Sequence, residues 1–208
     1  MFITFEGMDG AGKTTQIRML QERLEAAGQC VLVTREPGGN AVAETIRAVL
    51  LDPKNDMDPL TEAYLYAAAR AEHVRAVIRP ALARGETVLC DRYLDSSLAY
   101  QGYGRGLGEA AVREINARAA ADCVPDRTYL LLLPETAAES RVRARGPRDR
   151  IESAGDAFLR RVEAGFRALA AREPARICAV DASGSPEEIA RRIAEDVANL
   201  QTRKAGQA

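Results

Sequence analysis

The feature that most constrains this chain is a glycine-rich segment near its N-terminus. Residues 7–15 read GMDGAGKTT and match the pattern G-x-x-x-x-G-K-[ST], in which a loop binds the phosphates of a nucleotide. An apolar run precedes the segment and an amphipathic stretch follows it, which is the strand–loop–helix order that the pattern requires. The alternative is a glycine-rich turn in some other strand–helix unit.

The residue types in this loop suit phosphate chemistry. Glycines allow successive backbone N–H groups to point into one concavity, and the N-terminus of the following helix adds a partial positive charge. Lys13 can reach the β- and γ-phosphates, and the Thr14 hydroxyl can ligate Mg²⁺. Lysine is otherwise found only at positions 54 and 204. The residues expected to bind ATP are Gly7, Met8, Asp9, Gly10, Ala11, Gly12, Lys13, Thr14 and Thr15.

Short apolar runs alternate with longer amphipathic stretches along the chain. The predicted strands are Phe2–Glu6, Cys30–Thr34, Thr87–Asp91, Thr128–Leu133 and Ile177–Asp181. Most of them lack in–out alternation, which is typical of parallel strands covered on both faces. We therefore expect one α/β domain over residues 1–201, a three-layer α/β/α sandwich of the P-loop NTPase fold with a five-stranded parallel sheet. A polar tail is expected at residues 202–208.

The last predicted helix carries a clear start signal. Ser185 suits the N-cap, Pro186 the first turn, and Glu188 the capping-box position. The apolar residues Ile189 and Ile193 then begin the face that the helix buries.

Composition excludes several classes of protein. The chain has 208 residues and a formal net charge of −1, so it lacks the global basic field that holds a nucleic-acid backbone. No apolar run approaches the roughly 18 residues of a membrane span, and the N-terminus does not resemble a signal peptide. We expect a cytoplasmic protein with neither a nucleic acid nor a membrane as partner.

Cysteine and histidine remove further options. Cys30, Cys90, Cys123 and Cys178 are far apart and have no histidine nearby, which disfavours a zinc site. Three of them, all except Cys123, adjoin predicted strands and are expected to be buried, reduced thiols. The single histidine, His73, lies in a helical stretch, where a helix-surface or supporting role is expected rather than a catalytic triad.

A second motif that bears on phosphate binding lies at the end of the predicted strand Thr87–Asp91. The carboxyl ends of parallel strands meet at one edge of a sheet, so Asp91 is expected beside the glycine-rich loop, near a hydrated Mg²⁺. Arg92 follows directly, and its guanidinium can bind two phosphates and hold them in line. A plain surface ion pair between the two residues is the alternative.

Residues 141–150 read RVRARGPRDR and place five arginines around a Gly-Pro break. A charge run is commonly a solvated helix face. The break instead favours an arginine-rich lid, at about residues 141–155, that closes over phosphates.

With these motifs in place, the chain resembles bacterial thymidylate kinase, a family of P-loop nucleoside monophosphate kinases. The resemblance implies transfer of the ATP γ-phosphoryl group to dTMP, with Mg²⁺, giving dTDP and ADP, in a homodimer. In this chain the apolar segments Ala63–Ala69 and Leu98–Tyr103 could contribute to the dimer interface or simply to the core. The matching pieces are FEG through Thr15, TREPGG at 34–39, AAR at 68–70, DRY at 91–93, SS at 96–97, AYQG at 99–102, RARG at 143–146 and DAS at 181–183.

The resemblance also implies where the acceptor binds. Asp9 would accept a hydrogen bond from the 3′-OH, and Tyr66 would stack on the thymine. Arg70 would donate to a thymine carbonyl, and Tyr100 would stand where a ribose 2′-OH must go. The full set of implied substrate residues is Asp9, Glu36, Pro37, Tyr66, Arg70, Arg92, Ser96, Ser97, Tyr100 and Gln101, of which Ser97 and Gln101 would reach the pyrimidine edge.

Charge at the transferring phosphoryl group must come from outside the loop. Eukaryotic relatives carry an arginine inside the glycine-rich loop, at the position where this chain has Gly10. A lid arginine is therefore expected here, as in the second type of bacterial member of the family. Arg141, Ala182 and Ser183 would contact ATP, the last two at the adenine. The implied catalytic residues are Lys13, Arg92, Arg145, Arg148 and Arg150, with no choice made among the three from the lid.

Other nucleotide-binding proteins fit less well. Another P-loop nucleotide kinase is the nearest alternative, but deoxynucleoside kinases typically carry Glu-Arg-Ser where this chain has Asp91-Arg92-Tyr93. A GTPase switch needs an N-K-x-D motif, which is absent from the sequence. A partition ATPase would need a second lysine early in the loop, where this chain has Met8.

Overall fold

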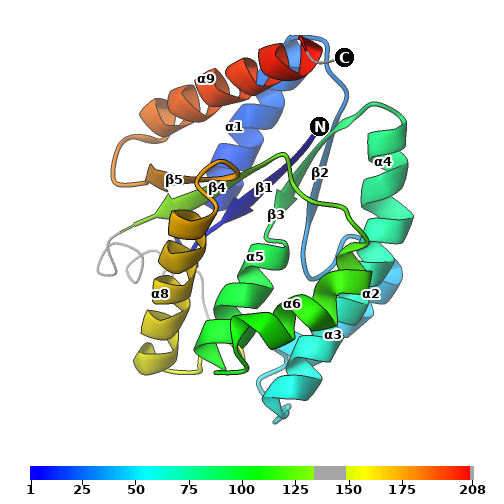
Figure 1. Ribbon diagram of the computed structural model, residues 1–208, viewed down its shortest axis with the longest axis vertical. Helices are drawn as coiled ribbons and strands as arrows, with labels where there is room; N and C mark the ends of the chain where they lie inside the picture. Colours follow the sequence, from blue (N-terminus) through cyan, green and yellow to red (C-terminus); the bar gives the residue numbers. More distant parts are fainter. Residues whose placement is uncertain (134–148, 207–208) are drawn as a thin grey trace.

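The computed structural model describes residues 1–133 and 149–206. These residues form a central sheet with helices on both faces (Figure 1). The expectations for Arg141, Arg145 and Arg148 lie outside the described residues.

The sheet has five parallel strands in the order β2-β3-β1-β4-β5. Since β1 lies in the centre, its carboxyl end is flanked by those of β3 and β4. The predicted five-stranded parallel sheet and three-layer fold are therefore confirmed. The strands are β1 (Phe2–Glu6), β2 (Val31–Arg35), β3 (Thr87–Asp91), β4 (Arg127–Leu132) and β5 (Ile177–Asp181).

Three strands have the predicted bounds and two are displaced by one residue. β2 begins at Val31 and β4 begins at Arg127, whereas Cys30 and Thr128 were expected. The pairing of neighbouring strands explains both displaced starts. Val31 pairs with Thr87 at the start of β3, and Arg127 pairs with Ile3 of β1. Strand ends are set by the neighbouring strand as well as by apolar sequence.

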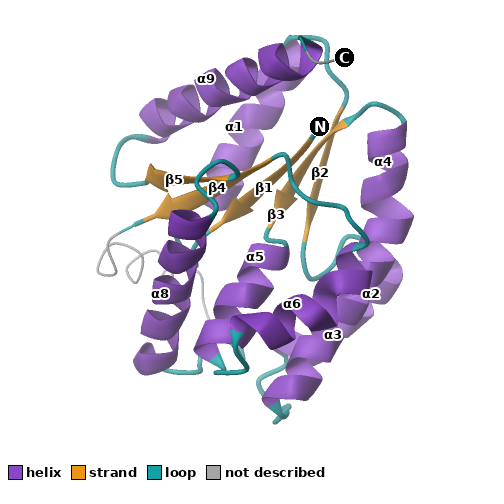
Figure 2. Ribbon diagram, in the orientation of Figure 1, coloured by secondary structure: helices purple, strands orange, loops and turns teal. Residues whose placement is uncertain are grey.

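Helices lie in the connections between successive strands, and α9 follows the last strand (Figure 2). Two segments, η1 and η2, are wound as π-helix and continue α3 and α5 respectively. The helical bounds are α1 (Lys13–Ala26), α2 (Ala41–Leu51), α3 (Pro59–His73), η1 (Val74–Ile78), α4 (Arg79–Ala83), α5 (Leu94–Ser97), η2 (Leu98–Gly104), α6 (Glu109–Ala120), α8 (Asp156–Arg172) and α9 (Pro186–Ala205).

Apolar clusters on each face of the sheet hold the layers together. On one face, α1 and α9 lie side by side and bury Ile17 and Ile193 against sheet residues such as Phe5 (Figure 1). On the other face, α8 packs on η2 through Phe158 and Phe166. Burial of such side chains from water supplies the main driving force for this arrangement.

The start of α9 follows its sequence signal. The Ser185 side chain accepts a hydrogen bond from the Glu188 backbone, and the Glu188 side chain accepts one in return, which completes the predicted capping box. The helix continues to Ala205, past the position at which the polar tail was expected to begin.

Two expectations about buried residues are wrong. Cys30 is exposed and Cys178 is only half-buried, because Cys30 precedes the edge strand β2 and Cys178 lies in the edge strand β5, whereas Cys90 and Cys123 are buried. His73 is completely buried rather than on a helix surface. It lies at the end of α3 that faces β2, so its supporting role is the part of the expectation that stands.

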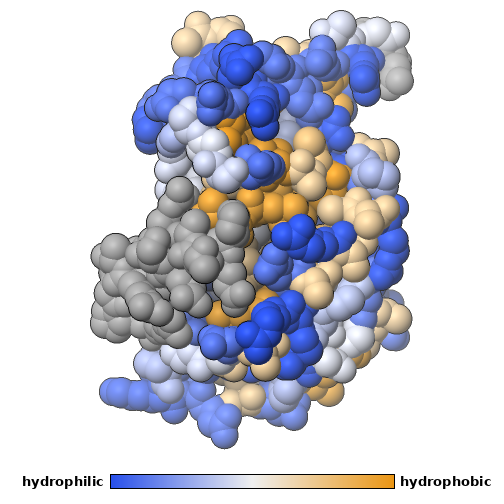
Figure 3. All heavy atoms as spheres, turned by 90° about the vertical axis from the view of Figure 1, so that its left-hand side faces the viewer, coloured by the Kyte–Doolittle hydropathy of each residue, from blue (hydrophilic) through white to orange (hydrophobic). Residues whose placement is uncertain are grey.

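No helix among the described residues is long and apolar enough to span a membrane. The side shown in Figure 3 has hydrophilic side chains at its top and bottom and apolar ones at mid-height.

Candidate active site

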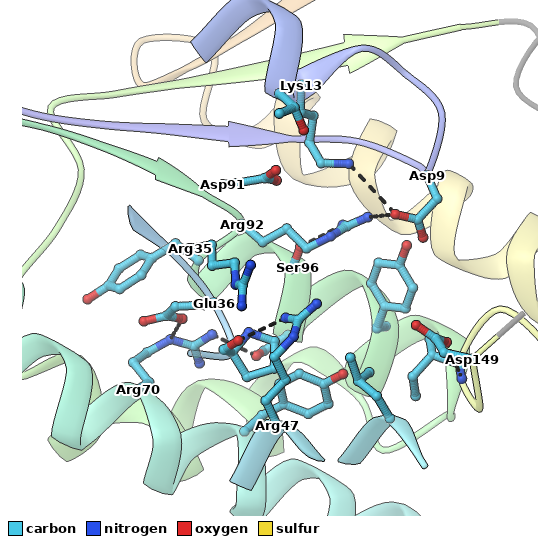
Figure 4. A pocket seen from close by; sticks show the side chains of 18 of the residues that line it. Asp9, Lys13, Arg35, Glu36, Arg47, Arg70, Asp91, Arg92, Ser96 and Asp149 are labelled. Atoms are coloured by element: carbon cyan, nitrogen blue, oxygen red, sulfur yellow. Dashed lines mark hydrogen bonds and ion pairs between the residues drawn. The ribbon is translucent and has the colours of Figure 1, made fainter. Parts of the chain in front are cut away.

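A cavity of about 270 Å³ lies at the carboxyl ends of β1, β2 and β3. The glycine-rich loop after β1 forms its upper part in Figure 4, and α2, α3 and η2 supply the rest. Carboxyl ends of parallel strands are where open α/β sheets bind ligands. Among the predicted residues, the cavity brings together Asp9, Gly10, Gly12, Lys13, Thr14, Glu36, Pro37, Tyr66, Arg70, Asp91, Arg92, Ser96, Ser97, Tyr100 and Gln101.

The glycine-rich loop has the backbone that its sequence requires. Gly7, Gly10 and Gly12 all have positive φ values, of 128°, 82° and 97°. A Cβ atom at Gly7 would lie 2.4 Å from the carbonyl oxygen of Leu131 on β4, so the close packing of loop on sheet excludes any side chain there. The loop therefore turns directly into the N-terminus of α1, where backbone N–H groups are available for an anion.

Lys13 begins α1 and points back over the loop. Its Nζ donates to the carbonyl oxygens of Gly7 and Met8 at 3.1 Å each and lies 4.0 Å from Asp9 Oδ1. Burial lowers the pKa of Lys13, and the charge of Arg92 lowers it further. The ammonium group is thus held at the mouth of the loop, where phosphates bind in P-loop sites.

The donor set for a divalent cation is small. Asp91 ends β3, and its Oδ1 is buried with no hydrogen-bond partner among the described residues. Thr14 is exposed at the cavity. The described residues include no cluster of three or more His, Cys, Asp or Glu that could hold a metal. Asp91 and Thr14 would supply the one or two protein oxygens through which Mg²⁺ is commonly bound, together with substrate phosphates and water.

Arg92 adopts a backbone conformation that is rare for an arginine. Its φ is 66°, a left-handed value that costs energy for any residue with a Cβ. The turn directs the side chain into the cavity, where Nη2 donates to Asp9 at 2.8 Å and Nη1 donates to Ser96 at 3.1 Å (Figure 4). The guanidinium also lies 5.2 Å from the centre of the Tyr100 ring.

Glu6, at the end of β1, holds the segment that follows Arg92. It accepts hydrogen bonds from the Tyr93 backbone at 2.8 Å and from the Ser96 hydroxyl at 2.5 Å. Burial and the neighbouring carboxylate of Asp95 raise the pKa of Glu6 to about 8. This role of Glu6 was not predicted.

Glu36 links the loop after β2 to α3. Arg70 Nε donates to Glu36 Oε2 at 2.8 Å, and His73 Nδ1 lies 3.0 Å from Glu36 Oε1. The other ring nitrogen of His73 lies 2.7 Å from the Thr34 hydroxyl. His73 therefore fixes the carboxylate that in turn fixes Arg70.

Arg70 is almost entirely buried yet reaches the cavity. Besides Glu36, its guanidinium donates to Ser97 at 3.0 Å and to Asn116. These three bonds occupy three of its five N–H donors, so the described residues leave two for a ligand.

Two tyrosines give the cavity its aromatic surface. Tyr66 from α3 lines it one helical turn before Arg70. Tyr100 from η2 packs against Phe158 and Phe166 of α8 with ring centres about 6 Å apart, and its buried hydroxyl has no hydrogen-bond partner among the described residues. Burial raises the pKa of both phenols, which therefore stay neutral.

Sequence reasoning missed part of the cavity lining. Arg47 comes from α2 and donates to the Pro37 carbonyl at 2.8 Å, and burial lowers its pKa. A basic residue one turn before Leu51, in a largely apolar helix, was the signal available in the sequence. The other missed lining residues are Arg35, Leu51, Tyr93, Asp149 and Ile151.

Some predicted residues do not line the cavity. The guanidinium of Arg150 pairs with Glu62 at 2.7 Å and donates to the Leu50 carbonyl. Ala182 is buried after β5, and the Ser183 backbone donates to Asp181 at 2.9 Å. Four residues of the glycine-rich loop also do not line the cavity: Gly7, Met8, Ala11 and Thr15.

Comparisons with known proteins agree with this geometry. A family model described as thymidylate kinase matches residues 5–193. The thymidylate kinase of Exiguobacterium sibiricum is 51% identical over 197 residues, covering 94% of this chain and 93% of the relative. That of Deinococcus radiodurans is 51% identical over 189 residues, covering 91% and 92%. The crystal structure of thymidylate kinase from Ehrlichia chaffeensis superposes with a TM-score of 0.77 at 32% identity, covering 95% of this chain and 97% of that chain. A glycine-rich loop, an Asp-Arg pair and an aromatic-lined cavity on a parallel sheet thus accompany close sequence similarity, and the chain belongs to the thymidylate kinase family.

Proposed function

We propose that this protein transfers the γ-phosphoryl group of ATP to dTMP and releases dTDP and ADP. The observation that carries the proposal is the position of Arg92. Its guanidinium lies between the glycine-rich loop, through Asp9, and the aromatic half of the cavity, through Tyr100. A residue there can contact both a donor phosphate on the loop and an acceptor phosphate in the cavity.

The residues divide the reaction between them. Lys13 and the backbone of the loop bind the ATP phosphates, and Arg92 aligns the acceptor phosphate with them. The attacking oxygen belongs to a phosphate that is already anionic, so no strong general base is needed. Catalysis then consists of positioning and of neutralising charge as it spreads over the transferring group. Bound Mg²⁺ would be held by Thr14 and Asp91 and would supply further charge neutralisation at the phosphates.

The lower half of the cavity is proposed to bind the deoxynucleoside. Tyr66 stacks on the base, while Arg70, Ser97 and Gln101 face its polar edge. Asp9 receives the 3′-OH, and Tyr100 occupies the space that a 2′-OH would need. Glu36 and Pro37 flank the sugar, and Ser96 supports Arg92.

Identification of the products tests this proposal. With ATP, Mg²⁺ and dTMP, the protein is expected to form dTDP and ADP in equal amounts, resolved by anion-exchange chromatography. Lys13→Ala should abolish both products because the P-loop cation is lost. ADP formed without dTDP would mean hydrolysis and would contradict the proposal.

We also propose that the protein is a homodimer. Of the two segments considered from the sequence, Leu98–Tyr103 is mostly buried in the core of one chain, whereas Ala63–Ala69 is divided between buried alanines and the exposed Tyr64. The large apolar side chains that remain exposed on the neighbouring helices α2 and α3 are better suited to a partner: Val42, Val49, Leu60 and Tyr64. A cytoplasmic location completes the proposal, since free thiols such as Cys90 stay reduced there.

A further inference from the structure

Glu62 is a completely buried carboxylate that does not line the cavity. It lies near the start of α3, accepts hydrogen bonds from Gln101 and Arg105, and forms an ion pair with Arg150. Its Oε1 accepts from Gln101 Nε2 at 2.9 Å and from Arg105 Nε at 3.1 Å. Its Oε2 accepts from Arg105 Nη2 at 2.9 Å and lies 2.7 Å from Arg150 Nη2. Burial alone would raise the pKa of Glu62, but these donors outweigh that effect and hold the pKa below its usual value.

The ionised carboxylate determines which way the Gln101 amide is turned. A carboxylate can only accept hydrogen bonds, so the amide must present its NH₂ group to Glu62. A planar amide with its nitrogen fixed has its oxygen fixed as well. Gln101 is itself almost completely buried and lines the cavity, so Oε1 is the acceptor that its amide leaves for a ligand.

We infer that Glu62 is a positioning residue that sets base specificity by holding Gln101 with its acceptor oxygen available to the acceptor base. Thymine and uracil carry an N–H donor at N3, whereas cytosine carries a lone pair there. An acceptor in the protein pairs with the first two bases and repels the third. The inference rests on the proposed function, because it takes Gln101 to face the pyrimidine.

Glu62→Gln reverses the hydrogen-bond polarity at this point. The arginines only donate, and two of their three contacts, from Arg105 Nη2 and Arg150 Nη2, meet at Oε2. The oxygen of the new amide is therefore expected at the Oε2 position, which turns its NH₂ toward Gln101. Gln101 must then present its own oxygen to residue 62 and its NH₂ to the base. We expect kcat/KM for dTMP to fall by at least about tenfold relative to kcat/KM for dCMP. The dTMP-to-dUMP ratio should stay unchanged, because both bases carry the N3 donor.

Arg105→Gln is the matched control. Arg105 binds the same carboxylate but does not line the cavity, so its loss should leave the dTMP-to-dCMP ratio unchanged. The double variant E62Q/R105Q removes one negative and one positive charge together and so keeps the buried cluster balanced. It should show the same loss of selectivity as Glu62→Gln, and it provides the test in the event that the single variant does not fold.

The outcomes distinguish a wrong assignment of Gln101 to the base from a wrong positioning role for Glu62. If Gln101→Met leaves the dTMP-to-dCMP ratio unchanged, the assignment of Gln101 to the base is wrong and the inference falls with it. If Gln101→Met lowers the ratio but folded Glu62→Gln or E62Q/R105Q does not, the binding site stands and the positioning role of Glu62 is wrong. Equal losses for dTMP, dUMP and dCMP would also overturn the inference, because they would indicate only structural damage.

Discussion

Single residues decide the chemistry at the strand ends. Arg92 is held in a left-handed backbone conformation with φ of 66°, which a bulky residue adopts only where its surroundings impose it. Here the Arg92 backbone N–H donates to Phe5 at 2.9 Å, and Glu6 holds the next residue. The strain is thus part of what directs the guanidinium into the cavity.

Replacing Arg92 tests this placement. Arg92→Ala should lower kcat with dTMP by roughly two to three orders of magnitude, since a cation on the transferring or accepting phosphate is lost. Arg92→Lys should recover only part of the rate because an ammonium group cannot bind two phosphates in a fixed plane. Arg113→Ala, a partly exposed arginine on α6, is the control and should retain full kcat. A loss in Arg92→Ala confined to thermal stability would argue against the role.

Tyr100 provides a test of sugar selection. Its hydroxyl is buried without a hydrogen-bond partner among the described residues, so it fills space without being needed for a bond. Tyr100→Phe removes that oxygen and keeps the ring against Phe158 and Phe166. We expect kcat/KM for UMP to rise severalfold relative to dUMP. An unchanged ratio between the two acceptors would show that another group excludes the 2′-OH.

At the scale of elements, strands and the glycine-rich loop follow from local sequence, but part of the cavity does not. Apolar runs identify strands because buried parallel strands need no polar face. Arg47 and Asp149 reach the cavity from α2 and from a turn, and their position depends on how those elements pack. His73 shows the same limit: helical sequence alone does not say which side faces β2, and Glu36 becomes its partner only in the folded chain.

The contact between β1 and the segment after β3 makes stability depend on pH. The pKa of Glu6 is about 8 in the folded protein against an ordinary 4.5, so the folded state binds this proton more tightly than the unfolded state. The contribution to stability is complete below pH 4.5 and is lost as the pH rises toward 8, at no more than about 1.4 kcal/mol per pH unit.

Urea unfolding of wild type and Glu6→Gln across this range measures the effect. The wild-type protein should lose more stability than Glu6→Gln between pH 5.5 and 8, because the amide cannot ionise. Parallel profiles for the two proteins would show that Glu6 titrates normally.

At the scale of the whole molecule, exposed apolar side chains bear on assembly. Val42 and Val49 are 55% and 44% exposed on α2, and Leu60 and Tyr64 are 43% and 57% exposed on α3. The members of each pair are seven or four residues apart and so share a face of their helix. Apolar side chains that are exposed on shared helix faces favour the proposed subunit interface.

Light scattering tests the proposed homodimer. The wild-type protein should have twice the chain mass of 22.5 kDa, and Tyr64→Glu should shift it toward the monomer by placing a charge in the interface. Val124→Glu introduces the same charge at a residue that is 63% exposed before β4 and should leave the dimer intact. A monomeric wild-type protein would rule out the homodimer.

The account as a whole depends on the cavity accepting a deoxynucleoside monophosphate. Its most direct test is the rate of ADP release with ATP, Mg²⁺ and each of dTMP, dUMP, UMP, dCMP, AMP, GMP and thymidine. We predict fast turnover with dTMP and much slower turnover with UMP and the purine nucleotides. Fast turnover with thymidine would contradict the account, because a nucleoside brings no phosphate for Arg92 to align. A rate that no acceptor increases would contradict it as well.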